Sequence, residues 1–341
     1  MSNLELDFSQ ENWDVPAEIF DGVWVIAARH HPGRASGFEL NNRTFIFRLR
    51  TQNGEKVLLS FGCGNAATIK AVQELEESEG VPLRWVLSNG GQHHLFLDLW
   101  YQSFPEARIL IPAKRIPFTQ NGRVLASKYR DRWELVEGPK PHQVVDEFGD
   151  QIDVVIFDQL LGAKELDASS GVALDHRSKP TKLSGFARLR LFSSLARDFS
   201  QPSDEVFFFH RASGLVIAGH NYQFIYTPKG HNPPAEFKMQ NGGFPLNILF
   251  RFLNPPGTFK SALEGQPAPV ADPKIHAEEW QAVLDWDIRA WTSCHNPPRV
   301  CGPDMSGEEI KAAVRASIAR SGEDDPTGAR LKWNIKNKNS D

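Results

Sequence analysis

The chain has 341 residues, 40% of them hydrophobic and including 23 Phe and 9 Trp, which is enough apolar material for the buried core of one large domain. The net charge is −4 and the 38 Lys and Arg residues are spread along the chain, so no basic patch for nucleic acid is indicated. The three cysteines, Cys63, Cys294 and Cys301, form no CxxC pair and argue against a disulfide framework or a thiolate zinc site.

The first residues, "MSNLELDFSQENWD", are acidic and polar and contain no apolar core of a signal peptide. No run in the chain approaches the roughly 18 consecutive apolar residues that cross a bilayer. We therefore expect a cytoplasmic protein that binds neither a membrane nor nucleic acid.

The first third of the chain predicts a strand, then two strands paired in a hairpin, then a helix. Strands are expected over 22–30, 43–51 and 57–62, with a hairpin turn at Asn53-Gly54. The middle strand alternates Phe45, Phe47 and Leu49 with Thr44, Ile46 and Arg48, a period of two. An apolar stripe at spacings of three predicts a helix over 65–80 that stops at Gly80.

The next segment reads strand, loop, helix, strand. Strands are predicted over 83–89 and 107–113, and a helix over 97–105, which favours a parallel α/β arrangement. The loop between the first strand and the helix, "SNGGQHHL", carries the adjacent His93 and His94.

The second half predicts fewer elements. The expected strands cover 151–160, 206–210, 215–218 and the segment from 289, and the expected helices cover 186–200, 273–288 and 306–322. Ser306 and Glu309 have the spacing of a capping box at the start of the last helix. A polar surface insertion is expected at about 162–203.

Histidine recurs in three segments of one form. "LRWVLSNGGQHH", "SGLVIAGH" and "IRAWTSCH" each consist of an apolar strand followed by His93 and His94, His220 or His295. Loops at the ends of strands in α/β sheets converge on one edge, and imidazole is a common metal ligand. Taken alone, His220 or His295 is more readily an ordinary loop residue, but the recurrence of histidine in three such segments predicts a metal site.

This order of motifs resembles the metallo-β-lactamase fold superfamily, over roughly residues 18–320. The family signature H-x-H-x-D-H follows the strand at 83–89. In "SNGGQHH", Asn89 and Gly91 stand at the first two histidine positions, His93 at the aspartate and His94 at the last histidine.

Two later motifs of the family also resemble segments here. "LVIAGH" matches a strand that ends in Gly-Asp, with His220 in place of the aspartate. "WTSCHNPP" matches the last motif and keeps its histidine as His295.

The resemblance implies an α/β fold, an αββα sandwich of two mixed sheets flanked by helices. The domain would cover 18–322, with the insertion at about 162–203. Residues 1–17 would form an N-terminal extension and residues 323–341 a C-terminal tail.

The resemblance also implies that one of two metal sites is lost. The first site of the family needs the two histidines that Asn89 and Gly91 replace, and a third from a middle motif, for which His142 and His176 are in range but lie in no convincing motif. All four positions of the second site are histidine. We therefore expect one divalent metal ion held by His93, His94, His220 and His295.

Four neutral ligands leave the charge of the ion uncompensated and favour activation of a water. The expected function is a mononuclear hydrolase of a small organic substrate, with zinc ahead of iron or manganese. One alternative is a non-heme iron oxygenase or oxidoreductase on the same fold, and another is a non-catalytic metal-binding or scaffold protein. Members of the family often dimerise, which allows a homodimer.

His30 and His31 lie in a loop that overhangs the metal in the family, so they are the candidates for general acid or base, although an exposed polar loop explains them equally well. Asp98, Asp287 and Asp304 are near the predicted ligands in sequence. They either orient imidazoles or are ordinary surface carboxylates and helix caps.

Overall fold

The computed structural model describes residues 12–30, 40–90, 94–139, 142–162, 201–219, 223–225, 258–260, 270–294 and 306–331. Within these ranges no helix is long and apolar enough to cross a membrane.

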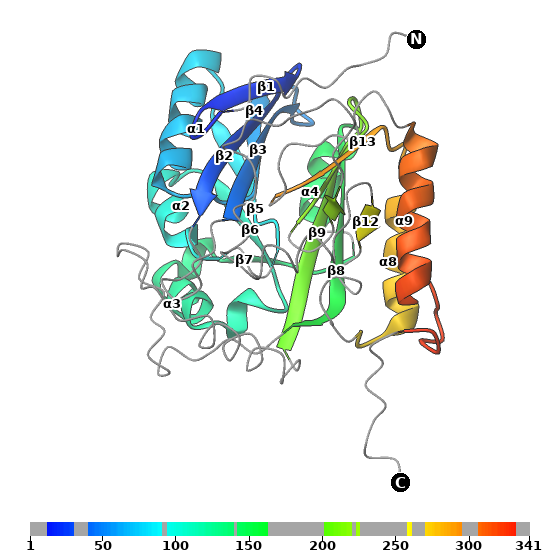
Figure 1. Ribbon diagram of the computed structural model, residues 1–341. Helices are drawn as coiled ribbons and strands as arrows, with labels where there is room; N and C mark the ends of the chain where they lie inside the picture. Colours follow the sequence, from blue (N-terminus) through cyan, green and yellow to red (C-terminus); the bar gives the residue numbers. More distant parts are fainter. Residues whose placement is uncertain are drawn as a thin grey trace, which may run out of the picture.

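A seven-stranded mixed sheet contains the first half of the chain, with its strands in sequence order (Figure 1). The strands are β1 (Pro16–Phe20), β2 (Val23–His30), β3 (Leu40–Arg50), β4 (Lys56–Phe61), β5 (Leu83–Leu87), β6 (Arg108–Pro112) and β7 (Glu134–Val136). From β1 to β4 neighbouring strands are antiparallel, and from β4 to β7 they are parallel. The hairpins therefore lie at one side of the sheet and the strand–helix–strand units at the other.

The second sheet is mixed as well and has the strand order β13-β10-β9-β8. Its strands are β8 (Ile152–Gly162), β9 (Gln201–His210), β10 (Leu215–Ala218) and β13 (Ala290–Ser293). β10 is antiparallel to β9 and parallel to β13. β11 (Gln223–Ile225) and β12 (Thr258–Lys260) form a separate pair.

Helices cover the outer face of each sheet (Figure 1). α1 (Ala66–Glu79), α2 (Leu97–Ser103) and α3 (Gln120–Lys128) lie on the side of the first sheet, and α8 (Pro273–Leu284) and α9 (Gly307–Ser321) on the side of the second. α4 (His142–Phe148) leads into β8, and two 3-10 turns (Ile116–Phe118 and Arg130–Arg132) flank α3. The predicted αββα sandwich of two mixed sheets flanked by helices is confirmed by this arrangement.

Alternation along the strands produces three apolar layers. In β3, Phe45, Phe47 and Leu49 face the space between the sheets, while Ile46 faces the layer of α1 and α2. In β9, Phe208 points between the sheets. Its neighbours Phe207 and Phe209 pack in the layer under α8 and α9. Because both faces of both sheets are buried, the strands read as nearly continuous apolar runs.

Two predicted helix ends are confirmed. The side chain of Asn65 accepts from the amides of Ala67 and Thr68, and Gly80 ends α1 in the left-handed conformation with φ 64°. Ser306 and Glu309 form both hydrogen bonds of the predicted capping box at the start of α9. These ends are decided by local chemistry, which explains why the sequence reveals them.

The predicted insertion at about 162–203 and the predicted helix over 186–200 lie almost entirely outside the described residues. After α9 the chain packs back on α8 as far as residue 331. The carboxylate of Glu323 accepts from the indole nitrogen of Trp280 at 3.0 Å, and Leu331 belongs to the core layer under α8 and α9.

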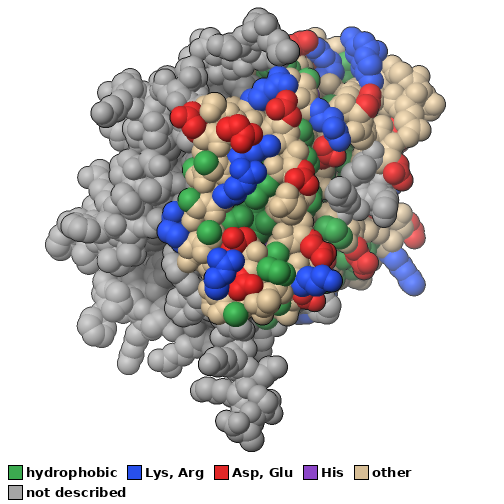
Figure 2. Space-filling model, turned by 90° about the vertical axis from the view of Figure 1, so that its right-hand side faces the viewer, with side chains coloured by type: hydrophobic (Ala, Val, Ile, Leu, Met, Phe, Trp, Pro, Cys, Tyr) green, Lys and Arg blue, Asp and Glu red, His purple; other side chains and the backbone are tan. Residues whose placement is uncertain are grey.

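Acidic and basic side chains are interspersed over the face formed by α8 and α9 (Figure 2). Two ion pairs there join Arg289 to Asp287 at 2.7 Å and Arg330 to Asp324 at 3.2 Å.

Candidate functional site

The strand ends that lead into the predicted ligands converge on one edge of the sandwich. β4, β5 and β6 are parallel neighbours, so their carboxyl ends lie together, and β10 and β13 end side by side in the second sheet. An isolated β-bridge between Gly90 and Glu205 connects the two sheets at this edge. Gly90 follows β5, Gly219 follows β10 and Cys294 follows β13, so all three predicted histidine-bearing segments begin here.

The end of β2 lies at the same edge. β2 and β4 are both antiparallel to β3, so β2 runs in the direction of β4 and ends at His30, paired with Leu40. The predicted acid or base His30 is therefore the last residue of a strand at the convergent edge. Its neighbour His31 lies outside the described residues.

Of the four predicted metal ligands, the structure describes His94, and the other three (His93, His220 and His295) lie outside the described residues. Their assignment stays a prediction. In the described part of the chain, no group of three or more His, Cys, Asp or Glu side chains has the arrangement of a metal site.

His94 is buried, with 5% of its surface exposed. Its Nδ1 lies 3.4 Å from the side-chain amide nitrogen of Asn121, in the first turn of α3. Thr119 caps that turn by accepting from the amide of Gly122 at 2.9 Å. Asn121 was not expected from the sequence, because α3 was not predicted and lies 27 residues from His94.

Asn89 stands at the first histidine position of the family signature and has a different partner. Its side-chain nitrogen lies 2.7 Å from the sulfur of Cys294, and both side chains are completely buried. The end of β5 is thereby joined to the end of β13 by side chains. Burial raises the pKa of the Cys294 thiol to about 12, the nearby charge of Glu205 raises it too, and Asn89 and Arg43 lower it. The thiol is therefore neutral near pH 7.

Two buried charged residues flank this contact. The side chains of Arg43 and Glu205 are both completely buried, and both act on the pKa of Cys294. The amide of Arg43 also donates to the carbonyl of Cys294 at 2.8 Å. Neither was predicted, although each is a charge at the start of an apolar run, "RTFIF" and "EVFFFH", on strands that begin at the convergent edge.

A second buried carboxylate, that of Asp204, fastens the end of β6 to β9. Its Oδ2 accepts from the backbone amides of Lys114 at 3.1 Å and Arg115 at 2.9 Å. Burial raises the pKa of Asp204 to about 6, and the charge of Asp158 adds to the rise, while the two amides lower it. Lys114 also pairs with Asp158 at 3.0 Å, so this part of the edge is fixed by charges as well as by strands.

Two carboxylates considered as partners of the predicted ligands are surface residues. Asp98 pairs with Lys128 at 2.6 Å and accepts from Tyr129. Asp287 is largely exposed and pairs with Arg289. Asp98 and Asp287 are therefore ordinary surface carboxylates, the second of the two roles considered for them. Asp304 lies outside the described residues.

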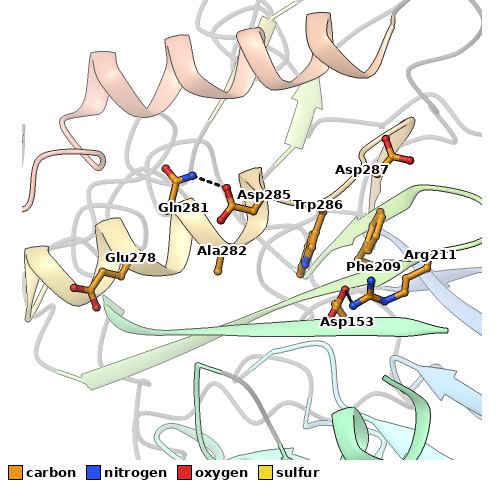
Figure 3. A pocket seen from close by; sticks show the side chains of 9 residues that line it. All are labelled: Asp153, Phe209, Arg211, Glu278, Gln281, Ala282, Asp285, Trp286 and Asp287. Atoms are coloured by element: carbon orange, nitrogen blue, oxygen red, sulfur yellow. Dashed lines mark hydrogen bonds and ion pairs between the residues drawn. The ribbon is translucent and has the colours of Figure 1, made fainter. Parts of the chain in front are cut away.

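A groove lies at the opposite end of the second sheet, where β8 begins and β9 ends (Figure 3). Phe209 and Trp286 stack in it with ring centroids 5.1 Å apart, and Asp153 pairs with Arg211 at 2.6 Å. Two further carboxylates, Glu278 in α8 and Asp285 at its C-terminal end, also line the groove. Because it is at the far ends of these strands, this groove is separate from the convergent edge.

His210, the last residue of β9, is also at that far end. Its Nδ1 lies 2.9 Å from the hydroxyl of Ser213, and its ring packs against Phe20 and Phe47. Burial lowers the pKa of His210 to about 4. His210 therefore lies at a turn at the end of the sandwich opposite the three histidine-bearing segments.

Comparisons with known proteins reveal similarity in structure and not in sequence. No family model matches the chain, and no curated protein matches it. Among solved structures, the metallo-β-lactamase FIM-1 from Pseudomonas aeruginosa in its mono-zinc form has 10% identity and a TM-score of 0.41, with 92% of this chain and 97% of that one covered. The metallo-β-lactamase DIM-1 exposed to ceftazidime has 9% identity and a TM-score of 0.42, with 89% and 96% covered.

A fragment (1–254) of a protein from Nostoc sp. PCC 7120 named as a diflavin flavoprotein has 9% identity and a TM-score of 0.44, with 91% of this chain and 95% of that one covered. At such identities and TM-scores these likenesses carry no argument about function, and the architecture rests on the strand pairings described above. The strand pairings and the helices on the outer faces make the described part of the chain an αββα sandwich.

Proposed function

We propose that this chain is a hydrolase that binds one divalent metal ion and acts on a small organic substrate. In this proposal His93, His94, His220 and His295 hold the ion, and His30 or His31 transfers a proton. The observation that carries it is the convergence of three histidine-bearing segments at one edge, where Gly90 and Glu205 bridge the two sheets.

The residues that the structure describes at this edge favour a site for one metal ion over a site for two. Asn89, at the first histidine position of the signature, is held by Cys294 at 2.7 Å between the sheets. An amide so placed is a poor substitute for imidazole as a ligand of zinc. The first metal site of the family therefore lacks a donor here.

His94 can serve as a ligand if the side-chain amide of Asn121 rotates. The structure places the amide nitrogen of Asn121 3.4 Å from Nδ1 of His94, so a ligand role through Nε2 requires this amide to rotate by about 180° and accept from Nδ1–H with its oxygen. Metal-binding histidines are generally held in this way through their other nitrogen. A divalent ion bound by neutral imidazoles supplies Lewis acidity that lowers the pKa of a water toward about 7.

The experiment is metal analysis of the full chain, purified without a histidine tag. We expect about one equivalent of zinc, loss of it in the His94→Ala/His220→Ala variant, and metal-dependent cleavage within a panel of esters, lactones and amides. His210→Gln is the matched control, because His210 lies at the opposite edge and its loss should leave the metal content unchanged. Iron with oxygen-dependent turnover would support the oxygenase instead, and a wild-type protein without metal would support the scaffold.

A further inference from the structure

A buried histidine joins α8 to the segment that follows α9. His276 lies in α8, where its Nδ1 is 3.2 Å from Oε2 of Glu279, and its Nε2 is 3.0 Å from Oε2 of Glu323. The imidazole and both carboxylates are buried, each at most 1% exposed. Because Glu323 stands just after α9, this contact attaches the end of one outer helix to the side of the other.

The positions of these atoms require a proton that a neutral histidine does not have. Both ring nitrogens of His276 face a carboxylate oxygen, but a neutral imidazole has one N–H and one lone pair. Without an extra proton, a lone pair faces an oxygen in the buried interior, where such a pair is costly. Burial lowers the pKa of His276, but Glu279 and Glu323 outweigh it and raise the pKa from 6.5 to about 9.

The strand β8 closes the other side of this cluster. The ring of Phe157 packs edge-on against the imidazole of His276, with the centroids 5.3 Å apart. The backbone amide of Asp158 donates to Oε1 of Glu279 at 3.1 Å. The carboxylate of Asp158 pairs with Lys114 at 3.0 Å, and its charge raises the pKa of Glu279. The charge from β8 therefore also favours a proton held in the cluster.

Glu323 attaches the segment 322–331 to α8. Its Oε2 accepts from the indole nitrogen of Trp280 as well as facing the imidazole, and both distances are 3.0 Å. Other hydrogen bonds of the segment run within it, such as the one from the amide of Arg330 to Asp325 at 2.9 Å. The segment thus has its own internal structure, and the contacts of Glu323 hold it against the helix.

We propose that the segment 322–331 is a proton-controlled latch, bound to α8 while the cluster of His276 and its two carboxylates holds the extra proton and detached when that proton is lost. Detachment takes Leu331 out of the apolar layer under α8 and α9. This inference does not rest on the proposed function, because the cluster shares no residue with the predicted metal site.

The test is hydrogen–deuterium exchange of the full chain at about pH 6.5 and about pH 9.5, with each rate divided by its intrinsic rate at that pH. We expect the protection of the segment 322–331 to fall at least about 10-fold between the two, because the proton is bound at the lower pH and lost at the higher. At the higher pH the segment should also be at least about 10-fold less protected than β9, which shows that it opens without global unfolding.

Glu279→Gln should make the contact independent of the proton. The new amide nitrogen donates to the lone pair of a neutral Nδ1, and its oxygen still accepts from the amide of Asp158. Nε2–H of His276 still donates to Glu323. The segment of this variant should keep its protection at the higher pH. Glu278→Gln is the matched control, because Glu278 is a carboxylate of the same helix with its side chain 66% exposed, and this variant should lose protection as the wild type does.

Two results in the wild type would overturn the latch: a protection of the segment 322–331 that does not change with pH, or one that equals the protection of β9 at both pH values. A fall that persists in Glu279→Gln would overturn it as well. The wild-type comparison decides alone if Glu279→Gln fails to fold, which circular dichroism reports.

Discussion

The side-chain amide of Asn89 donates a hydrogen bond to the thiol of Cys294 over 2.7 Å, and both groups are completely buried between the sheets. This contact joins the ends of β5 and β13, which are 205 residues apart in sequence. A hydrogen bond between buried side chains therefore connects a strand of the first sheet to a strand of the second.

Cys294→Ala should lower the free energy of unfolding by about 1–3 kcal/mol, because it leaves the buried amide of Asn89 without its acceptor. Cys294→Ser retains an acceptor and should lower it less. Urea unfolding of both variants measures the difference. A serine variant less stable than the alanine variant would contradict the role of the hydrogen bond.

Gly219→Ala should destabilise the fold by about 1–3 kcal/mol or more, because the new Cβ would meet the carbonyl of Asn89 at 2.2 Å. The same Cβ would also lie 2.6 Å from Oε2 of Glu205. The end of β10 must then move away from β5, so metal affinity should fall with stability. Gly54→Ala, in the β3–β4 turn and far from this edge, should leave metal affinity unchanged in a titration with Zn²⁺.

Asp204→Ala should lower the free energy of unfolding by more than Asp204→Asn does. The alanine leaves the buried amides of Lys114 and Arg115 without their acceptor, at a cost of about 1–3 kcal/mol each, whereas the asparagine oxygen still accepts. Chemical denaturation ranks the two variants. Equal stabilities would show that this carboxylate does not fasten β6 to β9.

A buried histidine predicts how stability depends on pH. His276 lies between Glu279 at 3.2 Å and Glu323 at 3.0 Å, and Glu323 also accepts from Trp280 and Ser321. Burial alone would lower the pKa of His276, but the two carboxylates outweigh it and raise the pKa from 6.5 to about 9. The folded state thus binds the proton more tightly than the unfolded state.

The stability from this proton is complete below about pH 6.5 and is lost as the pH rises toward about 9. We expect the free energy of unfolding to fall by on the order of 2 kcal/mol over that range, and His276→Gln to flatten the decline. His210→Gln is the control, because the lowered pKa of His210 acts below pH 6.5 instead. An unchanged decline in His276→Gln would refute the assignment.

His30→Gln or His31→Gln should reduce the hydrolytic rate by at least about 100-fold with metal content unchanged, if one of them transfers the proton. Steady-state kinetics and metal analysis of the same samples separate this role from metal binding. Loss of metal in either variant would make that histidine a ligand, and an unchanged rate in both would leave the proton transfer to another group.

The sequence predicts those features that depend on neighbours in the chain. The alternation of Phe45 and Phe47 identifies β3, and the Ser306–Glu309 pair identifies the start of α9. The short edge strands β1 and β7 give too few residues for a period and were missed. The expected strand at 43–51 begins earlier, at Leu40, because pairing with β2 extends it to His30.

The candidate site is only partly visible in the sequence. Histidines after strand ends indicate which edge of the sheets carries it. Arg43, Glu205 and Cys294 come from three strands far apart in the chain, and only the fold brings them together. The sequence shows that Arg43 and Glu205 stand next to apolar runs, but not which residues they contact, because that depends on how the strands pair.

The most direct measurement is X-ray absorption at the metal edge of the full chain, combined with a crystal structure that locates the ion by anomalous scattering. The account predicts one ion with four imidazole nitrogens, from His93, His94, His220 and His295, at about 2.0–2.1 Å if the metal is zinc. Two ions in one chain, or one ion bound without these four histidines, would contradict it.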